Sequence, residues 1–358
     1  MATATLEPKR SSTSWLDRPV ASLVSLDLEK LAYIALIVLG FITRFYDLGV
    51  RVMSHDESLH TQFSWYLYQG KGFQHTPMMH GPLKFELTAF LYWMFGDNDF
   101  TARISAALMG VIAIGLMWFY RRWLGRAGAL AAGVFLLISP YQLYYARYIR
   151  DEPYVMVWGL LLALFVFRYM ETRQLKFIYA LTAVMALFYA TMESSYIYVA
   201  IVLVFLGVYF LAEVTINEWP RPELKSTFWT ATSVMLLAAL IGVGLFLIND
   251  RLGLEGTVFT AQTGNPDEAA LHPATAYTVA ADVAFLVALV AGIVTLGVVM
   301  RAFGRRVRNF ASLDLIMALG VFVLPQAAAL PVMMLGRKAT DYIAPPLVGM
   351  DSLDFWQN

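Results

Sequence analysis

Long apolar segments, separated by short polar connections, recur along the chain. A bilayer core of roughly 30 Å needs about 20 apolar residues in a helix that rises about 1.5 Å per residue. Nine segments approach this length: residues 31–49, 102–120, 127–146, 153–170, 177–192, 196–213, 227–248, 276–300 and 313–335. The pattern therefore predicts an all-α fold, a polytopic transmembrane helical bundle with about nine spans.

The segment at residues 81–96 is apolar but short, and it carries Lys84 and Glu86. We interpret it as an interfacial or half-inserted helix. Basic residues then gather in alternate connections, and these residues are Lys9, Arg10, Arg18, Lys30, Arg121, Arg122, Arg126, Arg168, Arg173, Lys176, Arg221, Lys225, Arg301, Arg305, Arg306 and Arg308. Because lysine and arginine resist translocation, the N-terminus is predicted to be cytoplasmic. Treating residues 81–96 as a full span would reverse this pattern from the second span onward.

This topology divides the chain into three parts. Residues 1–30 form a cytoplasmic tail, residues 31–336 a transmembrane domain and residues 337–358 an outer tail. Within the transmembrane domain, residues 50–100 make a long outer loop that contains the interfacial helices, and loops of this length are usually functional. The last residues do not resemble a membrane terminus, so we expect a truncated or reduced protein.

The composition narrows the class of protein further. The chain is 59% hydrophobic and 15% charged, with a mean hydropathy of +0.60, which is too apolar for a soluble domain. Equal numbers of basic and acidic residues, 26 of each, give no field suited to nucleic acid. There are no cysteines, which excludes disulfides, cysteine-ligated metals and thiol nucleophiles. The first thirty residues lack a signal-peptide pattern, so the first span is expected to be a retained signal anchor.

The predicted outer loop opens with two adjacent acids, Asp56 and Glu57, directly after a span. Ionisable groups at such a depth are functional candidates. Ser54 followed three residues later by Glu57 is also a capping box, which would start a helix that runs to about Gln69. The apolar face of this helix would consist of Leu59, Phe63, Tyr66 and Leu67. A capping role for Ser54 and a chemical role for Asp56 are compatible, and both stay open.

Four of the five histidines lie in the same loop: His55, His60, His75 and His80. The zinc metalloprotease helix needs two histidines four residues apart, whereas His55 and His60 are five apart. Such clusters more often serve hydrogen bonding at an interface than metal binding.

A second polar cluster, Arg147, Arg150, Asp151 and Glu152, lies at the outer end of a predicted span. Arginine at headgroup depth binds phosphate oxygens through two hydrogen bonds, but taken by itself the cluster is better explained by a salt-bridge network that anchors the helix end. Glu193 is a third outer acid, in the turn between two spans. Together these positions suit a site that holds a lipid phosphate while a hydroxyl is deprotonated.

Several short motifs follow one another in a fixed order over roughly residues 31–215. They are His55-Asp56-Glu57, His80-Gly81-Pro82-Leu83, Phe95-Gly96, Arg103, Arg121-Arg122-Trp123-Leu124-Gly125, Ser139-Pro140, Arg147 and Asp151. This order resembles the C-type glycosyltransferase superfamily, in particular its protein mannosyltransferase and aminoarabinose transferase branch. The first two motifs look closest to the prokaryotic membrane proteins described as flippase-activity-associated.

The resemblance implies sugar transfer from a polyprenyl-phosphate carrier to an acceptor hydroxyl on the outer side of the membrane. Asp56 would be the general base, Glu57 would orient the base or the acceptor, and Asp151 would be the second catalytic acid. The expected substrate-binding residues are His55, His80, Arg147, Arg150, Glu152 and Glu193, with Arg147 or Arg150 neutralising the leaving phosphate. Because members differ in metal use, a divalent Mg or Mn ion held by Asp56 and Asp151 stays open.

The implied setting is the plasma membrane of a prokaryote. The expected partners are the lipid-linked donor, membrane lipids and a protein, lipid or glycan acceptor, with no nucleic acid. The alternative is a non-catalytic protein that binds lipid-linked sugars or assists a flippase, with the same acids serving recognition. An ion-coupled transporter fits less well, because the middles of most spans lack acids and no inverted repeat is evident.

Overall fold

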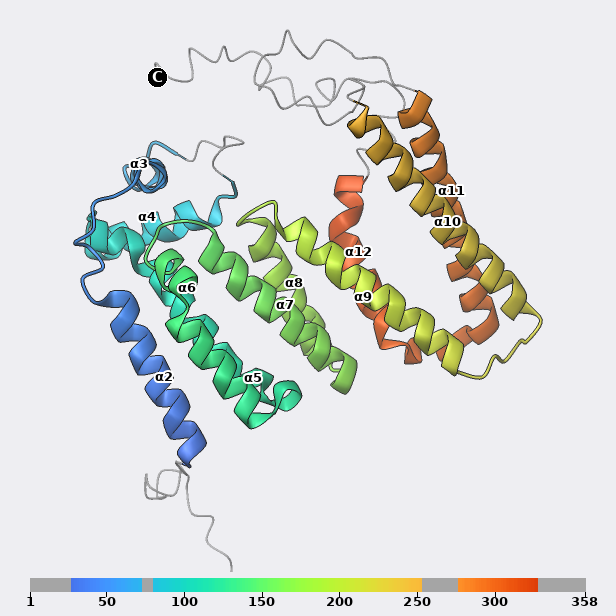
Figure 1. The fold of residues 1–358 in the computed structure, drawn as a ribbon, viewed down its shortest axis with the longest axis horizontal. Helices are drawn as coiled ribbons and strands as arrows, with labels where there is room; N and C mark the ends of the chain where they lie inside the picture. Colours follow the sequence, from blue (N-terminus) through green and yellow to red (C-terminus); the bar gives the residue numbers. More distant parts are fainter. Residues whose placement is uncertain (1–26, 73–79, 253–275, 328–358) are drawn as a thin grey trace, which may run out of the picture. The chain divides into compact units, whose positions relative to one another are not determined.

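A computed structural model describes residues 27–72, 80–252 and 276–327, and within them all regular structure is helical (Figure 1). In chain order the helices are α2 (Leu28–Phe45), α3 (His55–Tyr68), α4 (Leu83–Phe95), α5 (Asp99–Ile138), α6 (Pro140–Tyr145), α7 (Glu152–Thr172), α8 (Leu175–Tyr189), α9 (Ser195–Ile216), α10 (Leu224–Arg251), α11 (Ala276–Phe303), the 3-10 helix η2 (Gly304–Asn309) and α12 (Ala311–Ala327). The predicted all-α, multi-pass membrane class is confirmed.

Each predicted span overlaps a helix. Residues 102–120 lie within α5, and residues 127–146 begin in α5 and end just after α6. Of the last predicted span, residues 328–335 lie outside the described residues. Gly125 interrupts α5 with φ +72° and ψ 167°, a conformation that glycine adopts without steric cost. A Cβ atom added at Gly133 would lie 3.9 Å from the Cβ atom of Met117, whereas a straight helix would separate these positions by about 24 Å. The chain therefore doubles back at Gly125, and the two halves of α5 pack side by side.

Five stretches of the described chain are long and apolar enough to cross a membrane by length and composition alone. They are Asp99–Ile138, Glu152–Thr172, Ser195–Ile216, Leu224–Asn249 and Ala276–Asn309. The helices α8 and α12 are apolar but shorter, and α2 carries charged residues near both ends. The count of nine spans therefore stays a prediction, while several membrane passes are established.

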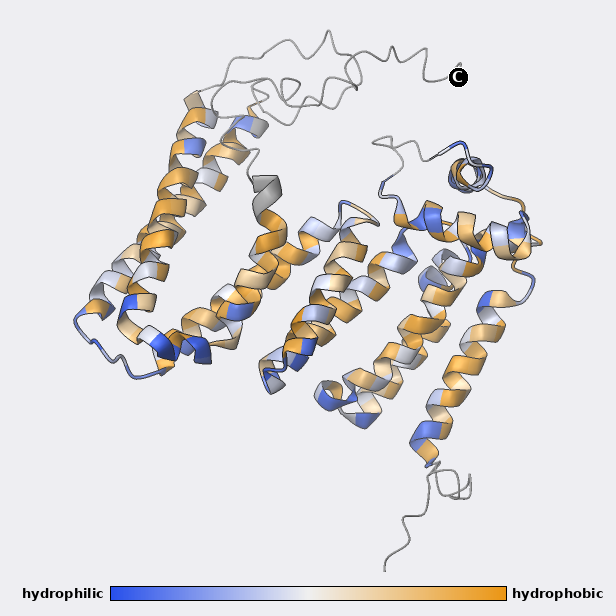
Figure 2. Cartoon of the chain, turned by 180° about the vertical axis from the view of Figure 1, so that it is seen from behind, coloured by the Kyte–Doolittle hydropathy of each residue, from blue (hydrophilic) through white to orange (hydrophobic). Residues whose placement is uncertain are grey.

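The helix surfaces have the character expected of a protein in lipid. Figure 2 shows hydrophobic residues along the helices and the most polar residues mainly near helix ends and in connections. Large apolar side chains such as Ile42, Leu240 and Ile293 are exposed on the outside of α2, α10 and α11. Exposed apolar surface on this scale is unfavourable in water and favourable in a bilayer.

The chain forms two compact units. The first consists of Met1–Phe165 with Ala183–Tyr196, and the second of Val166–Thr182 with Ile197–Asn358. An aromatic cluster that includes Phe228, Phe303 and Phe310 forms a core in the second unit. All the candidate site residues predicted from the sequence belong to the first unit, so only that unit positions the site.

Helix α4 lies across the direction of α2 and α5 (Figure 1) and packs against α3 and α5. Its 13 residues extend about 20 Å, less than a bilayer core, in agreement with its exclusion from the predicted spans. Its start is attached to the turn after α8, because Gly81 N donates to Thr191 O at 3.0 Å and Leu83 N donates to Ala190 O at 2.9 Å. A Cβ atom at Gly81 would come within 2.2 Å of Ala190 O, so only glycine allows this approach.

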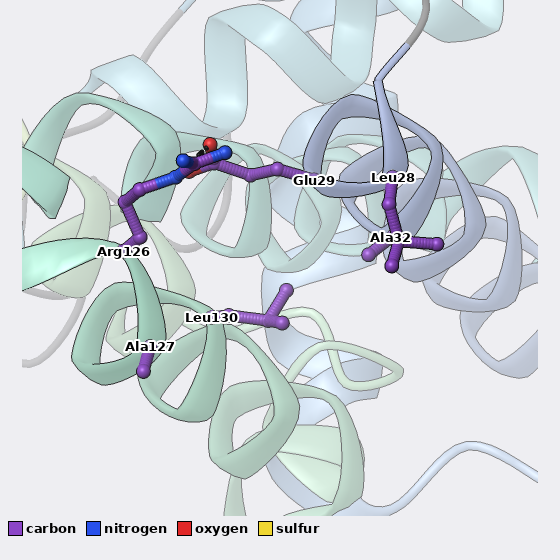
Figure 3. Close-up of a pocket in the computed structure, with 6 residues that line it drawn as sticks. All are labelled: Leu28, Glu29, Ala32, Arg126, Ala127 and Leu130. Atoms are coloured by element: carbon purple, nitrogen blue, oxygen red, sulfur yellow. Dashed lines mark hydrogen bonds and ion pairs between the residues drawn. The ribbon is translucent and has the colours of Figure 1, made fainter.

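A hollow of about 250 Å³ lies beside the first turn of α2 (Figure 3), at the opposite end of that helix from the segment that leads to α3. Its lining residues are Leu28, Glu29, Ala32, Arg126, Ala127 and Leu130. Within it the Nε atom of Arg126 donates to Glu29 at 2.6 Å. The hollow lies between α2 and the second half of α5, and none of the predicted site residues lines it.

Candidate functional site

The first turn of α3 is fixed by the predicted capping box. The Ser54 side chain accepts a hydrogen bond from Glu57 N, and Glu57 in turn accepts one from Ser54 N at 3.2 Å. The helix begins at His55 and has its C-cap at Gln69, as the sequence pattern predicts. Because successive residues of a helix point about 100° apart, this turn sends Asp56 and Glu57 into different surroundings.

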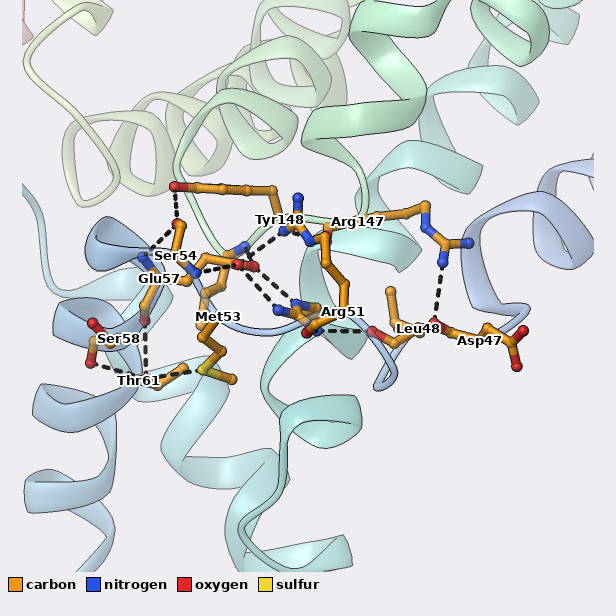
Figure 4. Close-up of polar contacts among 12 residues, drawn as sticks. Asp47, Leu48, Arg51, Met53, Ser54, Glu57, Ser58, Thr61, Arg147 and Tyr148 are labelled. Carbon is orange, nitrogen blue, oxygen red and sulfur yellow. Dashed lines mark hydrogen bonds and ion pairs between the residues drawn. The ribbon is translucent and has the colours of Figure 1, made fainter.

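Glu57 points into the protein and is fully buried. Arg103 donates to both of its carboxylate oxygens, from Nε at 2.8 Å and from Nη2 at 3.0 Å. Arg51 adds a third contact at 2.8 Å (Figure 4), and Ile149 N adds a fourth at 3.3 Å. Burial alone would raise the pKa of Glu57, but the hydrogen bonds and charge of Arg103 outweigh it and hold this pKa below its usual value. Glu57 thus ties the first turn of α3 to α5, and through Arg51 it also holds loop 1, the segment between α2 and α3.

Asp56 points the other way, and its side chain is 48% exposed. Its Oδ2 atom accepts a hydrogen bond from Arg150 Nη1 at 3.0 Å. The Nε atom of the same guanidinium lies 3.3 Å from Glu152 Oε1. Asp56, Arg150 and Glu152 therefore form a connected, partly open row between the start of α3 and the start of α7.

Asp151 lies between Arg150 and Glu152 in sequence but is almost completely buried. Lys84 of α4 donates to its Oδ2 atom at 2.6 Å, and Lys84 Nζ also lies 3.4 Å from His60 Nε2. Asp151 Oδ1 and His60 Nδ1 have no hydrogen-bond partner among the described residues. The cluster of Lys84, His60 and Asp151 joins α3, α4 and the start of α7.

Burial controls the proton affinities in this cluster. It raises the pKa of Asp151, an effect that the charge of Lys84 only partly offsets, and it lowers the pKa of Lys84. Burial, assisted by the nearby charge of Lys84, lowers the pKa of His60 to about 3. His60 is therefore neutral at physiological pH and accepts or donates hydrogen bonds without a charge.

Arg147 lies beside the end of α2 and donates to backbone carbonyl groups (Figure 4). Its Nη1 atom donates to Thr43 O at 2.9 Å and to Tyr46 O at 2.7 Å, and its Nη2 atom donates to Asp47 O at 3.2 Å. These contacts satisfy carbonyl groups that a helix end leaves without partners. Arg147 is thus separated in role from Arg150, although both were predicted to bind substrate.

The remaining predicted residues lie at two places. His80 Nδ1 is 2.7 Å from Glu193 Oε2, which connects the start of α4 to the turn after α8. His55 is exposed at the first position of α3. The structure therefore brings Asp56, Arg150 and Glu152 together, places Asp151 in the buried cluster with Lys84, and links His80 with Glu193 by a separate contact.

The acids do not fit a divalent metal ion. Among the described residues no group of three histidine, aspartate or glutamate side chains is arranged to hold one. The carboxylate of Asp56 forms an ion pair with Arg150, and that of Asp151 forms one with Lys84. Since each candidate ligand already contacts a cation, no step of the chemistry below uses a metal.

The sequence reasoning missed Lys84, His60 and Arg51 as members of the site. A signal for Lys84 was present, because a lone cation in an apolar segment usually pairs with an acid. The predicted apolar face of α3 is not its buried face: Leu59, Phe63, Tyr66 and Leu67 are only partly buried, whereas Glu57, His60 and Ser64 are buried. Polar residues turn inward here because they have hydrogen-bond partners inside the protein. Glu57 pairs with Arg103 of α5, and His60 lies beside Lys84 of α4.

Comparison with known families gives one match. Residues 79–248 match the family model described as dolichyl-phosphate-mannose-protein mannosyltransferase, and this range is slightly less than half of the chain. The match includes Lys84, Arg103 and Asp151 but begins after Asp56 and Glu57. It supports a relationship to the C-type glycosyltransferases. No curated protein and no solved structure matches the chain.

Proposed function

We propose that this protein is an inverting membrane glycosyltransferase that moves a sugar from a polyprenyl-phosphate donor to an acceptor hydroxyl, with Asp56 as the general base. The observation that carries the proposal is the half-exposed Asp56 carboxylate beside Arg150, whose guanidinium also contacts Glu152. The family match supplies the donor class. The acceptor is a protein, lipid or glycan hydroxyl.

The transfer requires one base and one stabilised leaving group. Asp56 takes the proton from the acceptor hydroxyl as the acceptor oxygen forms a bond to the anomeric carbon. The bond from that carbon to the phosphate oxygen breaks, and its electron pair stays on the polyprenyl phosphate. Because attack and departure occur on opposite faces of the sugar, the anomeric configuration inverts.

The other residues of the site hold these groups in place. Arg150 reaches both Asp56 and Glu152, and its guanidinium can exchange a carboxylate for the departing phosphate, which it binds with similar geometry. Asp151 and Lys84 fix the start of α7 against α4. Glu57 acts as a positioning residue, since its carboxylate is buried and engaged by Arg103 and Arg51.

We further infer that the site faces the outer side of a prokaryotic plasma membrane, with the N-terminus in the cytoplasm. The alternating distribution of basic residues supports this orientation. The motifs His55-Asp56-Glu57 and His80-Gly81-Pro82-Leu83 support the prokaryotic, flippase-associated branch. A cysteine introduced at exposed Val52 would be labelled by a membrane-impermeant reagent in intact cells, and labelling only after lysis would overturn the orientation.

The transfer is tested with purified protein, a panel of polyprenyl-phosphate sugars and candidate acceptors. The proposal predicts acceptor-dependent release of polyprenyl phosphate, lost in Asp56→Asn and retained in Glu86→Gln. Glu86 is a suitable control because it is an exposed acid on α4. Equal release by the wild-type protein and Asp56→Asn would refute the general base.

One observation favours the alternative of a non-catalytic protein that binds lipid-linked sugars. Both Asp56 and Asp151 contact a cation, as acids used for recognition or stability often do. That alternative predicts donor binding without release of polyprenyl phosphate under any acceptor. Turnover in the assay above would reject it.

A further inference from the structure

A second hollow lies between the end of α2 and helix α6, apart from the row formed by Asp56, Arg150 and Glu152. Its volume is about 320 Å³, at the lower end of the range typical of ligand pockets. The lining residues are Leu48, Arg51, Pro140, Leu143, Tyr144 and Arg147. Two arginines thus share a small pocket whose other walls are apolar or aromatic.

Positive charge at this pocket exceeds negative charge. Arg103 is fully buried next to Arg51, since it donates to Arg51 O at 3.0 Å and shares Glu57 with it, which makes three guanidinium groups in one region. The nearby carboxylates are Glu57, which Arg51 and Arg103 already share, and Asp47, whose carboxylate is turned away from Arg147 in Figure 4. Burial lowers the pKa of Arg147, and the charges of Arg51 and Arg103 add to this effect, which the charge of Asp47 opposes only in part.

Arg51 keeps hydrogen-bond donors that the described residues do not use. Its guanidinium stacks on the rings of Tyr144 and Tyr148, with distances of 5.3 Å and 5.1 Å to the ring centres. Only its Nη2 atom donates to described residues, to Glu57 at 2.8 Å and to Arg147 O at 3.5 Å. Since 41% of the side chain is exposed, the Nη1 and Nε atoms are available to a ligand.

The surroundings of the pocket favour a lipid as the source of that anion. The helix ends beside it expose Tyr46, Ile138 and Tyr141, each more than half exposed. Tyrosine is enriched where a membrane protein crosses the headgroup layer, and exposed aliphatic side chains just below that layer contact acyl chains. A headgroup in the pocket could therefore keep its acyl chains in the bilayer.

We propose that this pocket binds the phosphate group of an anionic phospholipid in the leaflet that faces loop 1. Arg51 contacts the phosphate oxygens through its Nη1 and Nε atoms, while Arg147 supplies charge from the opposite wall. The bound lipid offsets the excess positive charge and stabilises the junction of α2, loop 1 and α6. This pocket is separate from the row of Asp56, Arg150 and Glu152, and it takes a structural lipid, not the donor.

The proposal is tested by native mass spectrometry of the purified full chain, with phosphatidylglycerol or phosphatidylcholine added at equal concentration. We expect retention of phosphatidylglycerol over phosphatidylcholine, with affinity reduced about tenfold in Arg51→Gln, as for the loss of a charged hydrogen-bond pair. Because Arg51→Gln also removes a contact to Glu57, a second variant, Leu143→Trp, fills the pocket without removing any arginine. It should reduce retention equally, whereas Arg168→Gln, which removes an arginine paired with Glu171 elsewhere, should not.

Several outcomes would overturn the proposal. They are equal retention of the two lipids by the wild-type protein, and unchanged retention in both pocket variants. Competition by millimolar inorganic phosphate that removes the lipid completely would identify a free-phosphate site and equally reject a lipid site. Loss of retention in Leu143→Trp with normal sugar transfer would support the proposal and separate this site from the proposed catalytic centre.

Discussion

Arg103 donates two hydrogen bonds to the carboxylate of Glu57, from Nε at 2.8 Å and from Nη2 at 3.0 Å, and both side chains are fully buried. The pair joins the first turn of α3 to the first turns of α5, across 46 positions of sequence. Asp56, the neighbouring acid, is half exposed and makes its ion pair with Arg150 outside this core. Two adjacent acids of similar chemistry therefore have different surroundings: Glu57 holds the first turn of α3 against α5, and Asp56 lies half exposed beside Arg150.

Replacement of Glu57 should mainly affect stability. Glu57→Gln leaves Arg103 buried without a counter-charge, and breaking one side of a buried ion pair costs about 3–5 kcal/mol. We expect the free energy of unfolding in detergent to fall by this amount. The control Glu86→Gln, on the exposed face of α4, should change it by less than about 0.5 kcal/mol. Equal, small effects of both substitutions would show that Glu57 does not anchor the loop.

Replacement of Arg150 should have the opposite profile. Its pairs with Asp56 and Glu152 are partly exposed, with side-chain exposures of 30%, 48% and 27%, so they contribute at most about 1 kcal/mol. Arg150→Gln should therefore fold normally but transfer sugar about 100-fold more slowly, because charge on the departing phosphate loses its partner. The two measurements are the unfolding free energy and kcat in the same preparation. Normal kcat in Arg150→Gln would remove Arg150 from the proposed mechanism.

Stability should depend on pH through His60. Its pKa is about 3 in the folded protein, compared with an ordinary value of 6.5. Below pH 6.5 the unfolded chain binds a proton at this position that the folded chain does not bind, so the free energy of unfolding falls as pH decreases from about 6.5 toward 3. The slope from this group approaches about 1.4 kcal/mol per pH unit.

Comparing variants whose unfolding is measured at pH 7, 6 and 5 isolates the contribution of His60. The variant His60→Gln should show a flatter decrease than the wild-type protein, whereas His55→Gln, at an exposed position, should follow the wild-type curve. Identical slopes in His60→Gln and the wild-type protein would contradict a buried neutral imidazole.

Gly81 should tolerate no side chain. Gly81→Ala would place a Cβ atom 2.2 Å from Ala190 O and disrupt the hydrogen bond from Gly81 N to Thr191 O. We expect a loss of stability of roughly 1–3 kcal/mol, the range for overpacking a close contact. Gly115→Ala is the matched control, since its Cβ would meet only a methyl group at 3.8 Å. Similar melting temperatures for the two variants would contradict the attachment of α4 to the turn after α8.

The sequence was sufficient for the features that depend on local order. The lengths of the apolar segments predicted where the helices lie, and the capping box of Ser54 and Glu57 predicted where α3 begins. The sequence could not show which of Asp56 and Glu57 turns inward, because that choice depends on Arg103, and it could not show that Lys84 reaches Asp151, 67 residues away. Arg147 and Arg150 looked equivalent for the same reason, since their partners lie on α2 and α3 respectively.

The central claim is that Asp56 removes a proton in the transfer step and does not merely bind the donor. The most direct measurement is the single-turnover rate of Asp56→Asn at saturating donor and acceptor, together with the dissociation constant of the donor. The account predicts a rate reduced about 10²–10⁴-fold, as for loss of a general base, with donor binding changed less than about threefold. A normal single-turnover rate, or a loss of rate explained entirely by weaker donor binding, would contradict it.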